Sequence, residues 1–224
     1  MFTGIIQSTG TVAKVEKIKK SVHIAIKIDP AISRGISDGG SVAIDGVCLT
    51  AIGVARESER RRSLSATTPN TLTFELMDST LKLTTLGARR VGDIVNIEPA
   101  MRARDIVGGH FVSGHVDGTA VIKNVKSKIK NERVLELNIS EKLARYVVSQ
   151  GSITVNGVSL TVVDVKKDSF SVALTKYTAT HTNLGALKIT DKVNIEVDMF
   201  AKYIFKFLNH YGSYKKIPHS RGKV

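Results

Sequence analysis

Short runs rich in Val, Ile and Thr recur along the chain, each bounded by Gly, Asp, Asn or Pro. The clearest are residues 11–15, 22–28, 41–44, 95–97, 119–122, 134–139, 153–155 and 193–197. β-Branched residues in short segments between turn residues are typical of strands. Many short strands separated by turns predict an all-β sandwich or closed barrel.

Two segments have helical periodicity instead. Residues 141–149 place Leu143, Val147 and Val148 on one side, which predicts a short amphipathic helix. Residues 198–211 carry apolar side chains three and four positions apart, at Met199, Phe200, Tyr203, Ile204, Phe207 and Leu208. Such a wide stripe has to be buried either on its own domain or on another subunit, and the sequence leaves both open.

The chain repeats itself in three blocks that keep one order. SVAIDGVCLT at 41–50 matches SITVNGVSLT at 152–161, LMDSTLKLTTLG at 76–87 matches LTKYTATHTNLG at 174–185, and DIVNIE at 93–98 matches DKVNIE at 191–196. The offset falls from 111 to 98, so the first copy holds 13 extra residues between about 56 and 70, a polar, basic stretch typical of a surface-loop insertion. The repeat predicts two homologous domains, residues 1–97 and 98–197, followed by a C-terminal segment, 198–224.

The repeat also pairs polar residues on one strand face. Cys48 precedes Thr50 by two positions, and Ser159 precedes Thr161 by two positions at the matching place. Alternate residues of a strand share a face, so each pair should look into one space. A lone cysteine is usually a small core residue. Because its counterpart is a polar serine, the position favours a ligand pocket over a dry core.

The overall composition narrows the class of protein. The 224 residues are 42% hydrophobic, enough for a packed core, and Cys48 is the only cysteine, which excludes an intrachain disulfide and a cysteine metal cluster. No apolar run approaches the roughly 20 residues that cross a bilayer, and the N-terminus lacks a secretory pattern. We therefore expect a soluble cytoplasmic protein with no membrane partner.

The net charge of +13 is large enough to suggest an anionic partner such as nucleic acid. Much of it gathers at Arg56 and residues 60–62, at lysines between 123 and 130, and in the tail after residue 214. Aromatic residues, on which bases would stack, are not interleaved with these charges. We interpret them as solvated loops and a tail, and expect no nucleic-acid partner.

The segment GGHFVSGHVDG, residues 108–118, concentrates Gly, His and Asp. Either histidine could transfer protons near neutral pH, or could be an ordinary hydrogen-bonded strand residue. In a strand, the spacing of five between His110 and His115 would place them on opposite faces, a poor arrangement for a metal, so we expect no metal site. A phosphate-binding loop, a dinucleotide fingerprint and a Ser-His-Asp spacing are absent from the sequence.

Several of these motifs together resemble the riboflavin synthase family, from residue 1 to about 208. They are MFTGI, the paired DGVCLT and NGVSLT, STLKLTTLG, GGHFVSGHVDGTA, and VNIEVD before the final helix. The resemblance implies an all-β fold of two tandem six-stranded Greek-key barrels plus a C-terminal α-helix that associates three subunits into a homotrimer. It implies an active site between the N-terminal barrel of one subunit and the C-terminal barrel of its neighbour.

The activity that the resemblance implies is the dismutation of two molecules of 6,7-dimethyl-8-ribityllumazine, held face to face. The products are riboflavin and 5-amino-6-(D-ribitylamino)uracil, in the last step of riboflavin biosynthesis. No metal or redox cofactor is implied, and lumazine synthase is a further partner that the family suggests. The alternative is a non-catalytic lumazine- or flavin-binding paralogue. Such proteins lose the pocket signature of the second barrel and the final helix, which this chain retains.

Site residues follow from the same resemblance, position by position. Catalytic roles fall to Ser41, Cys48, His115, Ser159 and Asp198, with Phe2 also at the reactive end and the identity of the base left open. The first pocket is expected to use Gly4, Ile5, Ile6, Ser41, Val47, Cys48, Leu49, Thr50, Glu75, Leu76, Met77, Asp78, Ser79 and Thr80. The second is expected to use Gly114, His115, Val116, Ser159, Leu160, Thr161, Thr175, Lys176, Tyr177, Thr178, Ala179 and Thr180. Gln150 is included as a substrate contact, although it stands where the family often has lysine.

Overall fold

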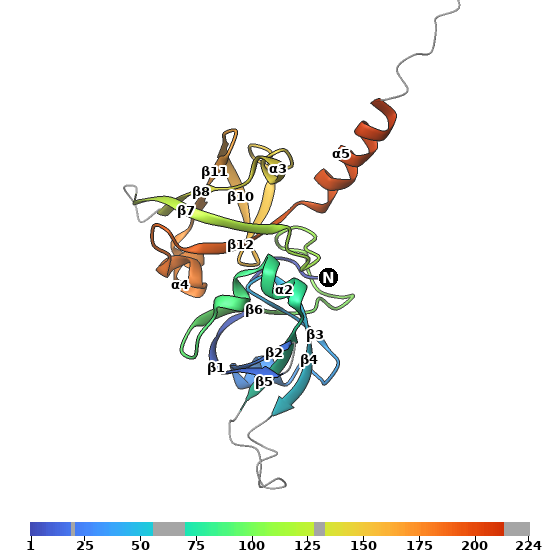
Figure 1. The fold of residues 1–224 in the computed structure, drawn as a ribbon, viewed down its shortest axis with the longest axis vertical. Helices are drawn as coiled ribbons and strands as arrows, with labels where there is room; N and C mark the ends of the chain where they lie inside the picture. The colour runs from blue at the N-terminus through green and yellow to red at the C-terminus, as the bar shows by residue number, and fades with distance from the viewer. Residues whose placement is uncertain (19–20, 56–69, 128–132, 213–224) are drawn as a thin grey trace, which may run out of the picture.

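Two closed antiparallel β-barrels and a C-terminal helix make up the computed structural model, which describes residues 1–18, 21–55, 70–127 and 133–212 (Figure 1). This arrangement confirms the predicted fold class. The basic insertion, residues 56–69, and the basic tail, residues 213–224, lie outside the described residues.

The N-terminal barrel is closed by six strands in the order β1-β2-β5-β4-β3-β6. Strands β3, β4 and β5 follow one another, and β2 lies beside β5, which is a Greek key. The strands are β1 (Ser8–Ile18), β2 (Ser21–Lys27), β3 (Ser41–Ile44), β4 (Val47–Ala55), β5 (Thr71–Leu76) and β6 (Ile94–Pro99). Short helices connect them: α1 (Pro30–Ser33), α2 (Asp78–Leu83) and the 3₁₀ helix η2 (Thr85–Ala88).

The C-terminal barrel repeats this topology strand for strand. Its strands are β7 (Gly118–Ser127), β8 (Arg133–Asn138), β9 (Ser152–Val155), β10 (Val158–Val165), β11 (Ser169–Leu174) and β12 (Lys192–Val197), with α3 (Glu141–Ala144), α4 (Lys176–His181) and η3 (Asn183–Ala186). Even the irregularities match, because β1 and β7 shift register at equivalent points, as do β4 and β10. The duplication therefore preserved the whole barrel design.

Each barrel has its own apolar core, formed by alternate residues of its strands. In β4, Val47, Leu49 and Ala51 point inward and are buried, while Cys48 and Thr50 point outward. This period-2 alternation is what a sheet buried on one face requires. The outward positions are consequently free to build a site on the barrel surface.

The predicted helix at 141–149 is much shorter than expected. Only Glu141–Ala144 is helical, and the Val148 side chain is 62% exposed. Beyond Ala144 the N–H groups of Tyr146 and Val147 donate to carbonyls three residues back, as in turns, and the Gln150 N–H donates to the carbonyl of Val162 in β10. Turns that lead to this strand contact replace the second half of the predicted helix.

The final helix, α5 (Met199–Gly212), projects from the C-terminal barrel (Figure 1). Its inner side is anchored by Phe205, whose ring lies 5.0 Å from that of Tyr146, and by a 2.7 Å ion pair between Lys202 and Asp117. The predicted stripe is not covered by its own domain, because its side chains are 57% to 67% exposed at Phe200, Tyr203, Ile204, Phe207 and Leu208. None of the described helices combines the length and apolarity needed to span a membrane.

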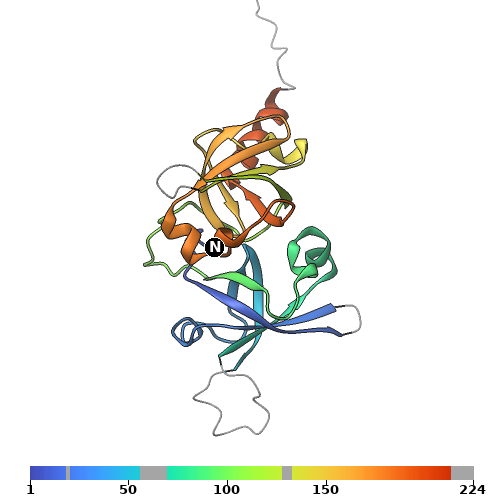
Figure 2. The ribbon, with the colours of Figure 1, turned by 90° about the vertical axis from the view of Figure 1, so that its left-hand side faces the viewer.

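The two barrels lie one above the other (Figure 2) and meet through a buried polar network. Within each barrel a backbone N–H donates to a hairpin-turn side chain, Asn96 to Asp45 and Asn194 to Asn156, each at 2.8 Å. Across the junction, the Asn96 amide donates to the Asn156 carbonyl at 3.0 Å and the Asn194 amide to the Asp45 carbonyl at 2.9 Å. These reciprocal bonds satisfy buried polar groups and fix the relative orientation of the barrels.

Candidate active site

The two polar strand pairs lie on the outer faces of their barrels. Cys48 is half-buried and Thr50 exposed on β4, and Ser159 and Thr161 have the same burial on β10. Each pair therefore shares one face, as the alternation predicted. Ser41 of β3 lies directly across from Thr50. Its equivalent, Ser152 opposite Thr161, was not singled out from the sequence although the repeated block contains it.

Two irregular segments cover these strands, and each covers the barrel of the other half. We call residues 2–4 the N-terminal strap and residues 112–114 the central strap. The Ser159 N–H donates to the carbonyl of Gly4 at 2.8 Å, and the Cys48 N–H donates to the carbonyl of Gly114 at 2.8 Å. The expected pockets had grouped Gly4 with Cys48 and Gly114 with Ser159. That grouping is wrong, because the straps are exchanged between the barrels.

Both strap glycines are required by this close approach. Gly4 has φ +74° and Gly114 has φ +80°, a region that other residues rarely adopt. A Cβ added at Gly4 would lie 2.6 Å from the Ser159 Cβ, and one at Gly114 would lie 2.6 Å from the Cys48 Cβ. The backbone can thus rest directly on the site strands only because no side chain intervenes.

The straps also pair with each other, through an antiparallel bridge between Phe2 and Val112. The Phe2 N–H donates to Val112 at 2.8 Å, and the Val112 N–H donates back at 3.1 Å. The Phe2 side chain is fully buried against Ala43 and Cys48. Its expected place among the reactive-end contacts is therefore not supported by its side chain, which packs beneath the surface.

A buried glutamate at the end of each barrel's last strand clamps one strap. The Glu98 carboxylate accepts from the Thr3 N–H at 2.7 Å, the Thr3 hydroxyl at 2.8 Å and the Gly4 N–H at 3.1 Å. Glu196 accepts from the Ser113 N–H at 2.7 Å, the Ser113 hydroxyl at 2.6 Å and the Gly114 N–H at 2.9 Å. Burial raises the pKa of both carboxyls, and these hydrogen bonds oppose that shift.

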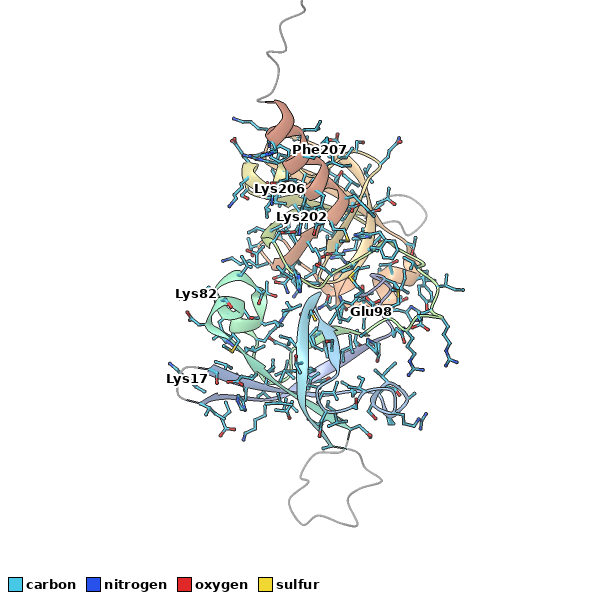
Figure 3. The ribbon with its side chains drawn as sticks, turned by 90° about the vertical axis from the view of Figure 1, so that its right-hand side faces the viewer. Lys17, Lys82, Glu98, Lys202, Lys206 and Phe207 are labelled. Carbon is cyan, nitrogen blue, oxygen red and sulfur yellow. The ribbon has the colours of Figure 1, made fainter. Side chains whose placement is uncertain are left out.

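Figure 3 shows Glu98 at the level where the barrels meet. Sequence reasoning used the repeated NIE of β6 and β12 only as evidence of duplication. Both glutamates are 2% exposed. A charged residue repeated in both copies directly after an apolar core position of a strand, Ile97 in β6 and Ile195 in β12, was the available signal for a special role, because charged side chains are rarely buried without partners.

The C-terminal site assembles three polar groups that lie far apart in the sequence. The Ser159 hydroxyl lies 2.7 Å from the Nδ1 atom of His110. Burial lowers the pKa of His110, and the nearby Asp198 carboxylate opposes that shift. Asp198 also accepts from the N–H of Phe200 at 2.9 Å and so begins α5. A serine, a neutral imidazole and a carboxylate are therefore gathered at one site.

The pairing of Ser159 with His110 was not anticipated. The argument from the spacing of the two histidines assumed a strand, but outside the bridge at Val112 residues 108–117 form none. The opposite-face argument for His110 and His115 consequently fails. His115 itself is exposed beside the Gly114 contact with Cys48, so the two histidines lie beside the site strands of different barrels. Among the described residues, no three His, Cys, Asp or Glu side chains gather closely enough to hold a metal ion.

Comparison with known proteins agrees with this duplicated site. A family model described as the lumazine binding domain matches twice, at residues 3–100 and 113–198. Curated relatives named riboflavin synthase include those of Actinobacillus pleuropneumoniae, 38% identical over 93% of this chain and 90% of the relative, and of Bacillus subtilis, with the same figures. That of Mycobacterium tuberculosis is 34% identical over 95% of this chain and its own full length.

The chain belongs to the riboflavin synthase family. Solved structures with a similar fold include LumP complexed with 6,7-dimethyl-8-(1'-D-ribityl) lumazine, at 23% identity and a TM-score of 0.75, covering 88% of this chain and 99% of that one. LumP complexed with riboflavin gives a TM-score of 0.77 at the same identity, covering 88% of this chain and all of that one. At this identity the likeness shows the fold alone.

Within this riboflavin synthase fold, the remaining residues expected to contact the substrate fall into two groups, buried and accessible. The side chains of five of them point into the barrel cores and leave only backbone groups for a ligand: Val47, Leu49, Leu76, Val116 and Leu160. Ile6 packs against the C-terminal core and Val116 against the N-terminal core, which follows the exchange of the straps.

The other expected contacts are accessible on the surface. Exposed side chains are those of Ile5, Glu75, Met77, Asp78, Ser79, Gln150, Thr175, Lys176, Tyr177 and Thr180, and Thr80, Thr178 and Ala179 are half-buried. Most of them belong to the strand end and first turn that lead into α2 and α4. Several already interact with neighbours there; for example, Asp78 pairs with Lys82 and Tyr177 stacks on His181.

Proposed function

We propose that this chain is a riboflavin synthase. It would catalyse a transferase reaction in which one 6,7-dimethyl-8-ribityllumazine gives a four-carbon unit to a second, yielding riboflavin and 5-amino-6-(D-ribitylamino)uracil. The observation that carries the proposal is the pair of matched outward-facing strands, Cys48 with Thr50 and Ser159 with Thr161, each completed by a glycine strap. Two similar receptacles suit a reaction that consumes two copies of one substrate.

The rate enhancement would come mainly from orientation. Two planar rings held face to face convert a bimolecular encounter into a reaction within one complex, which can supply roughly 7–11 kcal/mol of the barrier. The strap glycines support this role, because without side chains the straps rest directly on the site strands and fix one edge of each site. The ligand contacts assigned above remain part of the proposal.

The facing rings are proposed to come from neighbouring chains in a homotrimer. The bridge between Phe2 and Val112 is antiparallel, so Gly4 and Gly114 leave it in opposite directions and the two sites of one chain diverge. The uncovered stripe of α5, which includes Phe207 and Leu208, offers an apolar surface for assembly. An exposed patch of this kind is typical of a protein–protein interface.

Proton transfer is assigned to the C-terminal site. The 7-methyl group of the substrate is acidic because its anion is delocalised over the ring, so a modest base suffices. The lowered pKa of His110 keeps the imidazole neutral near neutral pH, and in the Nε2–H tautomer its Nδ1 accepts the Ser159 hydroxyl proton. Ser159 takes the proton of the substrate's 7-methyl group as it passes its own hydroxyl proton to His110, and Asp198 stabilises the imidazolium that forms.

The test needs only the purified protein, the lumazine and buffer. We expect the green fluorescence of riboflavin to appear, with one riboflavin formed for every two lumazines consumed. Substituting Ser41, Cys48, His115 or Asp198 should reduce turnover far more than stability. Tight stoichiometric binding without any product would instead favour the non-catalytic lumazine-binding alternative. Wild-type turnover in all four variants would refute the site assignment while leaving the function intact.

A further inference from the structure

Each strap is held by one barrel and seated on the other. Glu98 of the N-terminal barrel clamps Thr3 and Gly4, and the Gly4 carbonyl receives the Ser159 N–H of the C-terminal barrel. Glu196 of the C-terminal barrel clamps Ser113 and Gly114, and the Gly114 carbonyl receives the Cys48 N–H of the N-terminal barrel. The hydrogen-bond chains therefore cross at the junction.

We propose that Glu98 and Glu196 are positioning residues that act crosswise, each setting the geometry of the site on the opposite barrel. Each carboxylate fixes two consecutive strap residues with three hydrogen bonds of 2.6 to 3.1 Å. Those residues place the strap glycine on the site strand and the next side chain, Ile5 or His115, beside it. The catalytic importance of this positioning rests on the proposed function, whereas the coupling of each glutamate to the site on the opposite barrel does not.

The crossing separates this role from a merely structural one. If a glutamate only stabilised its own barrel, substituting it would loosen the strap at the site on that barrel, the nearer site, or the straps at both sites equally. The crosswise role predicts that the strap at the site on the opposite barrel loosens more. Because the bridge between Phe2 and Val112 joins the straps, a smaller effect on the nearer site is expected as well.

Glutamine is the substitution of choice at both positions. It keeps the size and shape of the side chain, but it replaces one acceptor oxygen with an NH₂ group that cannot accept from the strap N–H groups. Each variant therefore loses at least one hydrogen bond to a charged acceptor, and the strap should lift from its seat more often. Loss of one such bond corresponds to about a tenfold or larger shift in the opening equilibrium.

The single cysteine supplies a direct readout at the N-terminal site. Cys48 is half-buried under the Gly114 contact, so its alkylation by iodoacetamide in the native full-length protein reports how often the central strap lifts. We expect Glu196→Gln to raise this rate by about tenfold or more, and Glu98→Gln by less than about threefold. The unfolding midpoints of both variants are measured as well, so that a difference in alkylation rate can be separated from a difference in global stability.

The duplication offers a mirrored control. In a protein carrying Cys48→Ser and Ser159→Cys, the only thiol lies under the N-terminal strap. In this background the order should reverse, with Glu98→Gln giving the larger acceleration. Comparisons are made within each background, so the proximity of His110 to position 159 affects both variants alike. If a glutamine variant does not fold, Glu98→Asp or Glu196→Asp replaces it, since the shorter side chain withdraws the carboxylate from the strap.

Reversal of the order between the two backgrounds is the result that supports crosswise positioning. Equal accelerations, no acceleration, or a larger effect from the glutamate of the labelled barrel would each overturn it. Riboflavin formation is not part of the readout. A protein that failed to make riboflavin could still show the reversal, so the two proposals fail separately.

Discussion

The two barrels share a scaffold but differ in the polar groups around their sites. Strand order, register shifts, glutamate clamps and strap glycines are the same in both. The C-terminal site joins Ser159 to His110 and has Asp198 directly after β12. At the position after β6 that corresponds to Asp198, the N-terminal half has Ala100. The thiol of Cys48 has no such histidine bonded to it among the described residues.

This difference shows which features each half had to keep. The features common to both halves hold a strap on an outward-facing strand, and that is what binding a similar ring in each site requires. The features restricted to the C-terminal site are a histidine hydrogen-bonded to the site hydroxyl and a carboxylate beside that histidine, and those are what moving a proton requires. We infer a division of labour in which the N-terminal barrel mainly holds one lumazine and the C-terminal barrel activates the other.

The largest effect should come from His110→Gln, which removes the titratable partner of Ser159. Riboflavin formation is expected to fall by about 10²–10⁴-fold, the usual contribution of a general acid–base group. Lumazine affinity, followed by fluorescence titration, should change by no more than about threefold, because binding relies on the retained scaffold. Turnover near the wild-type rate would contradict the proposed division of labour between the barrels.

Substitutions at the junction between the barrels should have a smaller effect, and that effect should differ between the two halves. The fully buried Asp45 carboxylate pairs with Arg89 at 2.6 Å, whereas the matching turn residue is the neutral Asn156. Arg89→Ala leaves that carboxylate without its cation, and we expect a loss of about 3–5 kcal/mol in the free energy of unfolding at pH 7. Asn156→Ala, the counterpart, leaves no unpaired charge, but it removes hydrogen bonds and places alanine at a φ of +47°, and should cost about 2–4 kcal/mol.

The pH dependence of the stability of these two variants tests whether the unpaired Asp45 charge causes the larger loss. Burial raises the pKa of Asp45 and Arg89 opposes the rise, so removing Arg89 raises the folded-state pKa further above its unfolded value. The folded protein then keeps a proton that the unfolded chain releases, and stability falls as pH increases through that window. The destabilisation by Arg89→Ala should therefore be smaller at pH 5 than at pH 7 in urea unfolding. Asn156→Ala should show no such relief.

The smallest effect is expected from Asp198→Asn, because asparagine retains the hydrogen bond that begins α5. The Asp198 carboxylate raises the pKa of His110 against the larger effect of burial. Without it the pKa of His110 falls further, so the acidic limb of the pH–rate profile should move to lower pH. Turnover on the plateau should drop by about tenfold or less, as expected for loss of partial charge stabilisation. A limb that moved to higher pH would contradict this assignment.

Local patterns predicted the strands and the shared faces, because period-2 alternation and the repeat are encoded within each segment. They predicted that Cys48 and Thr50 face one way on β4. They could not predict the exchange of the straps, since Gly4 and Ser159 are brought together only by the docking of the barrels. The same holds for His110 and Ser159. The segment around His110 lacks strand structure because its glycines and the strap contacts replace regular pairing.

Helix length also depended on contacts remote in sequence. The periodicity of residues 141–149 suggested two turns or more, yet the residues after Ala144 form turns that lead to the hydrogen bond from Gln150 to Val162. The stripe on α5 was predicted as a pattern, but whether its own domain buried it could be decided only in three dimensions.

The most direct measurement is a crystal structure of the protein with an unreactive lumazine analogue bound. The account predicts one ring against Cys48, Thr50 and the central strap, and a second against Ser159, Thr161 and the N-terminal strap, with His110 at the second ring only. A single ring bound between the barrels, or inside either barrel core, with both strap-covered strands empty, would contradict the claim that the duplicated outer faces are the two halves of the active site.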